Sequence, residues 1–260
     1  MGSAAIQGEL WGRQSRDWAA IQELTCNAGY FYALNYLNLN PADKLLDIGC
    51  GSGVFSSLAS ATGAYVTGID ASAGMIAQAW ERGTTANFTT GEMEELPFAD
   101  DIFDVVCGFN SFQFAADTGN ALAEARRVLK PGGKMVVMIW GNRADCEAAS
   151  SIDALAAISA PAAPGSPGPF ALSENQLLEK KMEEAGIRVV VSKDIDTDWN
   201  YPDTTVALRG LLSSGPATRA IAHSGFERTE EALRQSMQPF VRENGRVVYH
   251  NKLRVVIGEK

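Results

Sequence analysis

Three glycines at alternate positions follow a short apolar run in the sequence LLDIGCGSG, which covers residues 45–53. They are Gly49, Gly51 and Gly53, and an aspartate, Asp47, precedes them. Glycine adopts positive φ without strain and has no Cβ to keep a ligand away from the main chain. If a helix begins directly afterwards, its first N–H groups are also free to bind a polar group. The stretch therefore predicts a loop at which a ligand contacts the backbone closely.

An acidic residue, Asp70, follows Gly49 by 21 residues, at the end of the next apolar run, AYVTGID. A carboxylate at such a position can accept hydrogen bonds from ribose hydroxyls. Alternatively, Asp70 only caps the helix that follows. The glycine spacing is GxGxG and not the dinucleotide pattern GxGxxG, and the phosphate-loop pattern GxxxxGK[ST] does not occur. The two features favour an adenosine-containing cofactor, either NAD or S-adenosylmethionine (SAM), over a nucleoside triphosphate.

The glycine loop can lie at the carboxyl edge of a parallel sheet only if strands and helices alternate along the chain. The sequence predicts this alternation. Apolar runs rich in Val and Ile predict buried strands, whereas longer segments with capping residues predict helices. Such alternation is typical of right-handed βαβ units in a mostly parallel sheet, whose ligands bind at the carboxyl ends of the strands. The expected strands are 44–49, 64–70, 87–93, 103–110 and 134–140, and the expected helices are 54–62, 72–83 and 120–133.

The two ends of the chain predict additional elements around this core. Residues 14–38 have the composition of one helix, and 172–186 predicts another, capped by Ser173 and ended by Gly186. Residues 204–238 predict two or three short helices that break at Gly210, at SSGP and at Gly225. A loop at 159–170 and strands at 187–199 and near the end complete the pattern. We expect one domain, 1–260, with a helical lid at 1–40, a cofactor-binding core at 41–140 and a helical acceptor-lid insertion at 200–240.

Composition narrows the functional classes. Hydrophobic residues make up 46% of the 260 residues, and the net charge of −9 argues against a nucleic-acid partner, which needs a basic face. The four cysteines form no CxxC pair, so neither a zinc site nor a disulfide scaffold is expected. No secretory signal pattern and no apolar run of about 18 residues occurs. We therefore expect a cytoplasmic protein without metal ligands and without membrane insertion.

Four segments together resemble the class I SAM-dependent methyltransferases, in particular the small-molecule type 11 branch that includes ubiquinone- and menaquinone-biosynthesis-like enzymes. These segments are LLDIGCGSG, VTGIDAS, GEMEELPFADDIFDVV and EARRVLKPGG, in the family's order and spacing over about residues 43–140. The resemblance implies a Rossmann-like three-layer αβα sandwich, in which a seven-stranded, mostly parallel sheet has an antiparallel last strand. It also implies methyl transfer from SAM to O, N or C of a small molecule by a monomer or homodimer, with S-adenosylhomocysteine as product. An NAD-type oxidoreductase and a non-catalytic SAM-binding protein are the alternatives.

The resemblance assigns cofactor contacts to positions along these segments. The backbone of the glycine loop would contact the methionine part of SAM, and other residues would bind the ribose, the adenine or the amino group. Met75 and Met93 are alternatively core residues, Cys50 a small filler within the loop, and Trp18 part of a helix that packs on the sheet edge. The implied cofactor-binding residues are Asp47, Gly49, Cys50, Gly51, Gly53, Asp70, Ala71, Met75, Glu92, Met93, Phe109, Asn110 and Trp18.

The sequence does not identify a catalytic base. Methyl transfer from a sulfonium requires mainly alignment and exclusion of water, and only a neutral hydroxyl acceptor needs a base. The two histidines, His223 and His250, are candidates, and Gln113 could face the methyl group or the acceptor. The candidates for an apolar acceptor wall are Tyr30, Tyr32, Trp140, Phe170, Trp199 and Tyr201.

Overall fold

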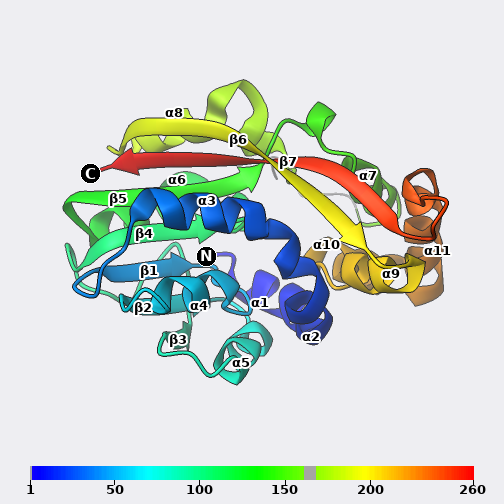
Figure 1. The fold of residues 1–260 in the computed structure, drawn as a ribbon, viewed down its shortest axis with the longest axis horizontal. Helices are drawn as coiled ribbons and strands as arrows, with labels where there is room; N and C mark the ends of the chain where they lie inside the picture. The colour runs from blue at the N-terminus through cyan, green and yellow to red at the C-terminus, as the bar shows by residue number, and fades with distance from the viewer. Residues whose placement is uncertain (1, 161–167) are drawn as a thin grey trace.

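A computed structural model describes residues 2–160 and 168–260 of the chain. A seven-stranded sheet forms its centre, with the strand order β3-β2-β1-β4-β5-β7-β6 (Figure 1). β7 runs antiparallel to both β5 and β6, whereas β1 to β5 are parallel, which confirms the predicted sheet. The strands are β1 (Lys44–Ile48), β2 (Tyr65–Asp70), β3 (Asn87–Thr90), β4 (Phe103–Phe109), β5 (Leu129–Trp140), β6 (Arg188–Tyr201) and β7 (Val247–Glu259).

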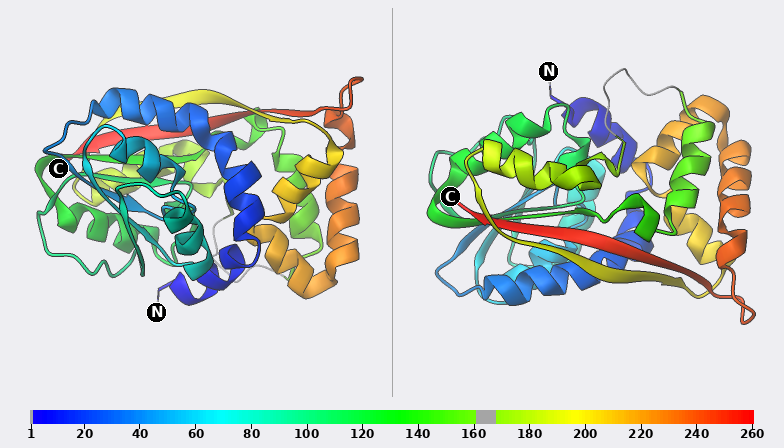
Figure 2. Two further views of the ribbon diagram at one scale, coloured as in Figure 1. Left: turned by 60° about the horizontal axis from the view of Figure 1, so that its bottom comes forward. Right: turned by 90° about the horizontal axis from the view of Figure 1, so that it is seen from above.

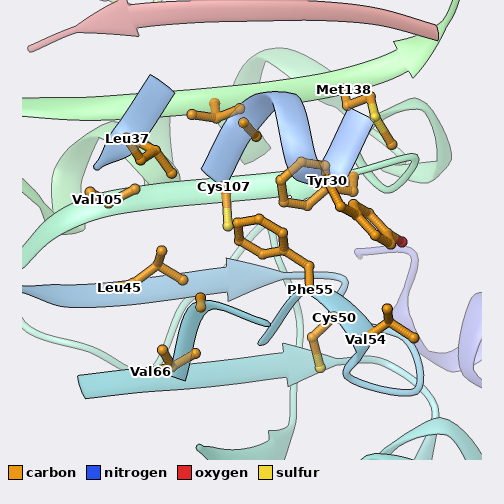
Figure 3. Close-up of a cluster of buried hydrophobic side chains, with 14 of the residues drawn as sticks. Tyr30, Leu37, Leu45, Cys50, Val54, Phe55, Val66, Val105, Cys107 and Met138 are labelled. Atoms are coloured by element: carbon orange, nitrogen blue, oxygen red, sulfur yellow. The ribbon is translucent and has the colours of Figure 1, made fainter. Parts of the chain in front are cut away.

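Helices cover both faces of the sheet and give the three layers (Figure 2). One face is covered by α3 (Asn27–Leu37), α4 (Val54–Ser60) and α5 (Ala73–Glu81), which bury Tyr30 and Phe55 among other side chains (Figure 3). The opposite face is covered by α6 (Thr118–Val128) and α8 (Leu177–Glu184). Because each helix buries one apolar side against the sheet, the sheet is held between two apolar cores and its carboxyl edge is fixed in position.

The N-terminal segment differs from the single helix that was predicted for 14–38. It contains α1 (Ala4–Gly12), a short α2 (Ser15–Asp17), a π-helical turn (Trp18–Gln22) and a 3₁₀ turn (Glu23–Cys26) before α3. Gln14, with φ −122° and ψ 31°, separates α1 from α2. The two irregular turns direct Glu23 into the protein, where its carboxylate has backbone partners, so tertiary contacts override the helical pattern here.

Four helices at one end of the molecule form a separate small core against the ends of β6 and β7 (Figure 1). They are α7 (Ala149–Ala157), α9 (Thr204–Leu212), α10 (Gly215–Ser224) and α11 (Phe226–Met237). The sequence predicted the region of α9 to α11 but not α7. The predicted break at Gly210 is wrong, because Gly210 is buried inside α9, where a Cβ would meet Gln22 Oε1 at 2.7 Å.

The predicted helix 172–186 is shorter than expected. Positive φ values at Asn175 and Gln176 interrupt it, and α8 begins only at Leu177. Ser173 does not cap it, because its hydroxyl donates to the carbonyl of Trp140 at 2.5 Å. Gly186 ends the helix as predicted, with φ +83°. Of the predicted loop at 159–170, residues 161–167 lie outside the described residues.

In the described part of the chain, the helices are all too short or too polar to cross a membrane.

Candidate active site

A cavity with about 870 Å³ of space, including the open solvent at its mouth, lies at the carboxyl ends of β1, β2 and β4. The loops after these three strands form one side, and the N-terminal segment forms the other. Twelve of the thirteen predicted cofactor-binding residues line this cavity, all except Gly53. The position agrees with the general rule that ligands of parallel α/β sheets bind beyond the carboxyl ends of the strands.

The glycine loop follows β1 directly and requires its glycines for geometric reasons. Gly49, Gly51 and Gly53 have φ values of +71°, +53° and +78°. The N–H groups of Gly49 and Cys50 both donate to the carbonyl of Ile69, at 2.7 and 3.1 Å, which ties the loop to the end of β2. A Cβ on Gly53 would meet Ala79 and Phe88 at 3.0 Å, so Gly53 allows α4 to pack closely while Gly49 and Gly51 face the cavity.

Glu23 is a cavity residue that the sequence analysis missed. Its side chain is buried, and its carboxylate accepts hydrogen bonds from the N–H groups of Ser52, at 2.9 Å, and Val54, at 3.2 Å. Burial raises the pKa of Glu23, although these hydrogen bonds and the nearby Arg82 oppose the effect. The free N–H groups at the start of α4, which a dinucleotide enzyme would offer to a pyrophosphate, therefore already bind a carboxylate.

Asp70 lies at the end of β2, where the sequence predicted a ribose ligand. Its two oxygens accept from Gly51 N–H at 2.9 Å and from Ser72 N–H at 2.8 Å. The cap of α5 is instead Ser72, whose hydroxyl accepts from Met75 N–H at 3.2 Å. A carboxylate has about four lone-pair positions, so Asp70 can still accept hydrogen bonds from two hydroxyl groups. Burial raises the pKa of Asp70, whereas its two backbone partners lower it.

Asp47 is held beneath the loop by Ser56, whose hydroxyl donates to it at 2.6 Å. Burial raises the pKa of Asp47 to about 7, and the negative charges of Glu23 and Asp70 add to the rise. A positively charged group in the cavity would favour the ionised form of Asp47 and would relieve the repulsion among the three carboxylates. SAM carries a sulfonium and an ammonium group, so this group of acidic side chains fits its charge.

The side of the cavity expected to hold the adenine is formed by Ala71, Met75, Glu92 and Met93. Helix α1 lies close to it, because a Cβ on Gly8 would meet the carbonyl oxygen of Ala71 at 2.4 Å. Glu92 accepts a hydrogen bond from the N–H group of Ala4 at 2.7 Å. Met75 is only 1% exposed, so it belongs to the core as well as to the cavity wall, and its contact with a cofactor stays a prediction.

The opposite end of the cavity is formed by Phe109, Asn110 and Trp18. Asn110 has a left-handed backbone with φ +52°, and its N–H group donates to the carbonyl of Met138 at 2.7 Å. Asn110 and Trp18 also line a second cavity, which Gln113 lines as well. Of the aromatic residues expected to form an acceptor wall, Trp140 and Trp199 line this second cavity, Tyr30 lines the first, and the other three line neither.

The two histidines lie outside both cavities. His223 is exposed near the end of α10, and the exposed ring of His250 contacts Asp198, with Nδ1 at 2.8 Å from the carboxylate. The structure therefore gives no support to either histidine as a base that touches an acceptor in these cavities. Gln113 is the one predicted catalytic candidate that the fold brings to a cavity wall.

Comparison with known proteins shows which protein family the segment around this site resembles. The family model of the methyltransferase domain matches residues 46–137, which contain the glycine loop, Asp70, Glu92 and Asn110. These residues form a methyltransferase domain. Its relatives and its motifs agree with the type 11 branch of the class I SAM-dependent methyltransferases, and SAM is the cofactor of this class.

Two curated relatives illustrate the range of similarity to this methyltransferase domain. The demethylmenaquinone methyltransferase of Mycobacterium marinum is 36% identical over 121 residues, which are 46% of this chain and 48% of that protein. The 27-O-demethylrifamycin SV methyltransferase of Amycolatopsis mediterranei is 29% identical over 78% of this chain and 77% of that protein. The chain spans about half the length, or less, of the first curated relatives it matches.

Solved structures share the fold of the methyltransferase domain and its surroundings. The YcgJ protein of Bacillus subtilis has a TM-score of 0.60 at 19% identity, covering 89% of this chain and 97% of that one. A complex from Haloferax volcanii, of the Trm112 methyltransferase activator with a methyltransferase, gives a TM-score of 0.62 at 20% identity over 95% of this chain and 97% of that one. At these identities, the likeness concerns the fold alone.

Proposed function

We propose that this chain is a SAM-dependent methyltransferase that transfers a methyl group to O, N or C of a small-molecule acceptor. The observation that carries the proposal is the arrangement of the two cavities. The acidic cavity at the glycine loop and the second, mostly apolar cavity share five lining residues: Trp11, Trp18, Cys26, Asn110 and Phe114. A cofactor in the first cavity and an acceptor in the second would therefore meet at these side chains.

The residues of the first cavity would bind and orient the cofactor, whose sulfonium supplies an electrophilic methyl group. Gly49 and Gly51 would allow close approach to the main chain, and Asp70 would accept the ribose hydroxyls. Glu92 and the N–H group of Met93 would bind the adenine, and the carbonyl of Phe109 would bind the amino group. Trp11 and Trp18, whose rings are 4.7 Å apart between centroids, would exclude water above the shared region.

The position of Glu23 favours SAM over a dinucleotide. Its carboxylate bonds the N–H groups of Ser52 and Val54, at the start of the helix where dinucleotide-binding folds hold the pyrophosphate. A pyrophosphate there would lose these donors and would face a carboxylate at close range. A non-catalytic SAM-binding protein is less well supported, because the cofactor cavity adjoins a second cavity with space for another molecule.

The rest of the proposal concerns partners and location. We infer a cytoplasmic protein, monomeric or homodimeric, that does not bind nucleic acid. The supporting observations are the net charge of −9 and four cysteines that are all buried and unpaired.

Titration calorimetry with S-adenosylhomocysteine and with NAD⁺ tests the choice of cofactor. We expect saturable binding of S-adenosylhomocysteine and none of NAD⁺. Incubation with SAM labelled in its methyl group and a panel of metabolites then tests catalysis. Binding of NAD⁺ in preference would refute the cofactor assignment, and tight binding of S-adenosylhomocysteine without transfer to any member of a broad panel would favour a non-catalytic protein.

A further inference from the structure

The second cavity has about 710 Å³ of space, including the open solvent at its mouth. It lies between the N-terminal segment, β4 and β5, and the helical end of the molecule. Aromatic rings form much of its described wall. Trp11 contacts both Trp18 and Phe114, at centroid distances of 4.7 and 5.3 Å, and Trp140 lies 5.3 Å from Trp199. The remaining described wall is mostly aliphatic or small, including Ala148, Ile152, Leu155, Leu211 and Pro216. Such a wall favours a flat, apolar ring system.

Charge is scarce in this wall. Among the described residues that line the second cavity, none is Asp, Glu, His, Lys or Arg. Cys26 is the one of these lining residues whose pKa is shifted. Burial raises the pKa of the Cys26 thiol to about 11, so the thiol is neutral at physiological pH. A permanently charged ligand would enter this wall without a counter-ion, which is unfavourable.

Among the described lining residues, one fully buried side-chain polar atom has no hydrogen-bond partner. Asn110 Nδ2 lies 3.4 Å from Cys26 Sγ and donates to it, and Gln113 Nε2 donates to Asn110 Oδ1 at 3.3 Å. These two bonds fix the orientation of both amides and leave Gln113 Oε1 as a buried acceptor with no hydrogen bond. Gln113 is only 4% exposed, so water does not reach most of its side chain. Buried amide oxygens are normally bonded, and an unbonded one on a residue that lines a cavity indicates a missing donor.

We propose that the second cavity binds an uncharged aromatic methyl acceptor whose hydroxyl or N–H group donates a hydrogen bond to Gln113 Oε1. This inference rests on the proposed function for its reaction, but its binding chemistry follows from the wall alone. Gln113 is then a specificity-determining residue, because an analogue without the donor would leave its oxygen unbonded. Gln22 lines the same cavity but its Oε1 already accepts from the hydroxyl of Tyr201 at 2.8 Å, so it offers no equivalent acceptor.

The test compares three probes of similar shape by titration calorimetry, each with and without saturating S-adenosylhomocysteine. 2-Naphthol carries a donor, 2-fluoronaphthalene has none, and 2-naphthoate carries a charge. We expect 2-naphthol to bind about tenfold or more tightly than either of the others. In Gln113→Met, which keeps the length of the side chain but removes the acceptor, the preference for 2-naphthol over 2-fluoronaphthalene should disappear. Gln22→Met is the matched control and should retain the preference.

Three results would overturn the inference: equal affinities of 2-naphthol and 2-fluoronaphthalene in the unmodified chain, a preference that persists in Gln113→Met, or tight binding of 2-naphthoate. The comparison within the unmodified chain does not depend on the folding of any variant. Failure to bind S-adenosylhomocysteine, with the 2-naphthol preference intact, would instead remove the proposed function and leave the chemistry of the second cavity in place.

Discussion

At the scale of single residues, four carboxylates surround the first cavity, and each accepts a hydrogen bond from the protein itself. Glu23, Asp70 and Glu92 accept from backbone N–H groups, and Asp47 accepts from the hydroxyl of Ser56. These bonds keep the carboxylates in place without neutralising them. The cavity is thus arranged for a ligand that brings positive charge and hydroxyl donors.

Asp70→Ala should weaken binding of S-adenosylhomocysteine about tenfold or more, because two ribose hydroxyls lose a charged acceptor. The same change removes the partners of Gly51 N–H and Ser72 N–H, so we also expect a lower melting temperature. Calorimetry and thermal unfolding measure the two effects. The exposed Asp196 provides a charge-matched control through Asp196→Ala. Unchanged affinity in Asp70→Ala would remove the ribose assignment.

Affinity for S-adenosylhomocysteine should rise by up to about tenfold between pH 6 and pH 8. The pKa of Asp47 is about 7 in the structure, against an ordinary value of 3.8, so below pH 7 this carboxyl must lose a proton to pair with the ligand's ammonium group. For the ligand-free protein the sign is opposite. The native state binds the extra proton, so the free energy of unfolding should fall as the pH rises from about 4 to 7.

Titrations at several pH values, in buffers that differ in ionisation enthalpy, measure the proton release on binding. The variant Asp47→Asn should flatten the pH dependence between pH 6 and 8. A flat profile in the unmodified chain would show that Asp47 does not couple to the ligand.

The residues of the cofactor cavity were largely predictable, whereas Glu23 was not. Gly49, Gly51 and Asp70 follow strands with a distinct apolar pattern, so their place at the sheet edge could be read from spacing. A glutamate within a helical segment carries no such signal, because most glutamates are exposed. Glu23 is buried only through the irregular turns that precede α3 and the N–H groups of the glycine loop.

At the scale of elements, α1 covers the cofactor cavity through contacts that depend on glycine. A Cβ at Gly8 would lie 2.4 Å from the carbonyl oxygen of Ala71, too close for α1 to keep its position. Gly8→Ala should therefore displace α1 and speed release of S-adenosylhomocysteine about fivefold or more, as expected for a loosened lid.

Stopped-flow tryptophan fluorescence measures this release. Gly168→Ala serves as control, since no atom of the described residues lies within 4 Å of a Cβ at Gly168. Equal release rates in both variants would argue that α1 is a fixed part of the wall and not a lid.

The elements that the sequence predicted are those with a strong period of their own. β1 to β5 and their helices have apolar runs, caps and glycine stops, and most occur near their expected positions. The predicted end of the helix 120–133 is wrong, because α6 ends at Val128 and residues 129–133 already belong to β5. Helix α1 has the sequence AAIQGELWG, and its apolar residues are scattered around the helix. It packs on the protein through Gly8 and Gly12. The sequence therefore showed neither an apolar face nor a glycine stop that would predict this helix. Helix α7 was missed for a similar reason, since its small residues, ASSIDALAA, fit a loop as well as a helix.

At the scale of the whole molecule, three cores meet through the central sheet. Two lie on its faces, and the third joins α7 and α9 to α11 to the ends of β6 and β7. β6 and β7 pair from Arg188 with Glu259 to Tyr201 with Val247, with one register shift between Val189 and Val191, so this long ladder ties the third core to the other two.

Differential scanning calorimetry should therefore show a single cooperative transition for the full chain. S-adenosylhomocysteine at about 100 times its dissociation constant should stabilise the protein by about 2.7 kcal/mol. NAD⁺ at the same concentration should leave the transition unchanged. Two resolved transitions, with only one shifted by the ligand, would show that the helical end unfolds independently.

The residues of the two cavities lie in different parts of the chain, and β6 and β7 connect these parts. The glycine loop, Asp70 and Asn110 all lie within residues 46–137, the segment that the family model matches. Trp199, Leu211, Ser214 and Pro216 of the second cavity lie on or after the far end of β6, outside that segment. The helical end is thus joined to the sheet through β6 and β7, and it also packs on the N-terminal segment. We expect substitutions in the helical end to change which acceptor binds while the cofactor cavity stays unchanged.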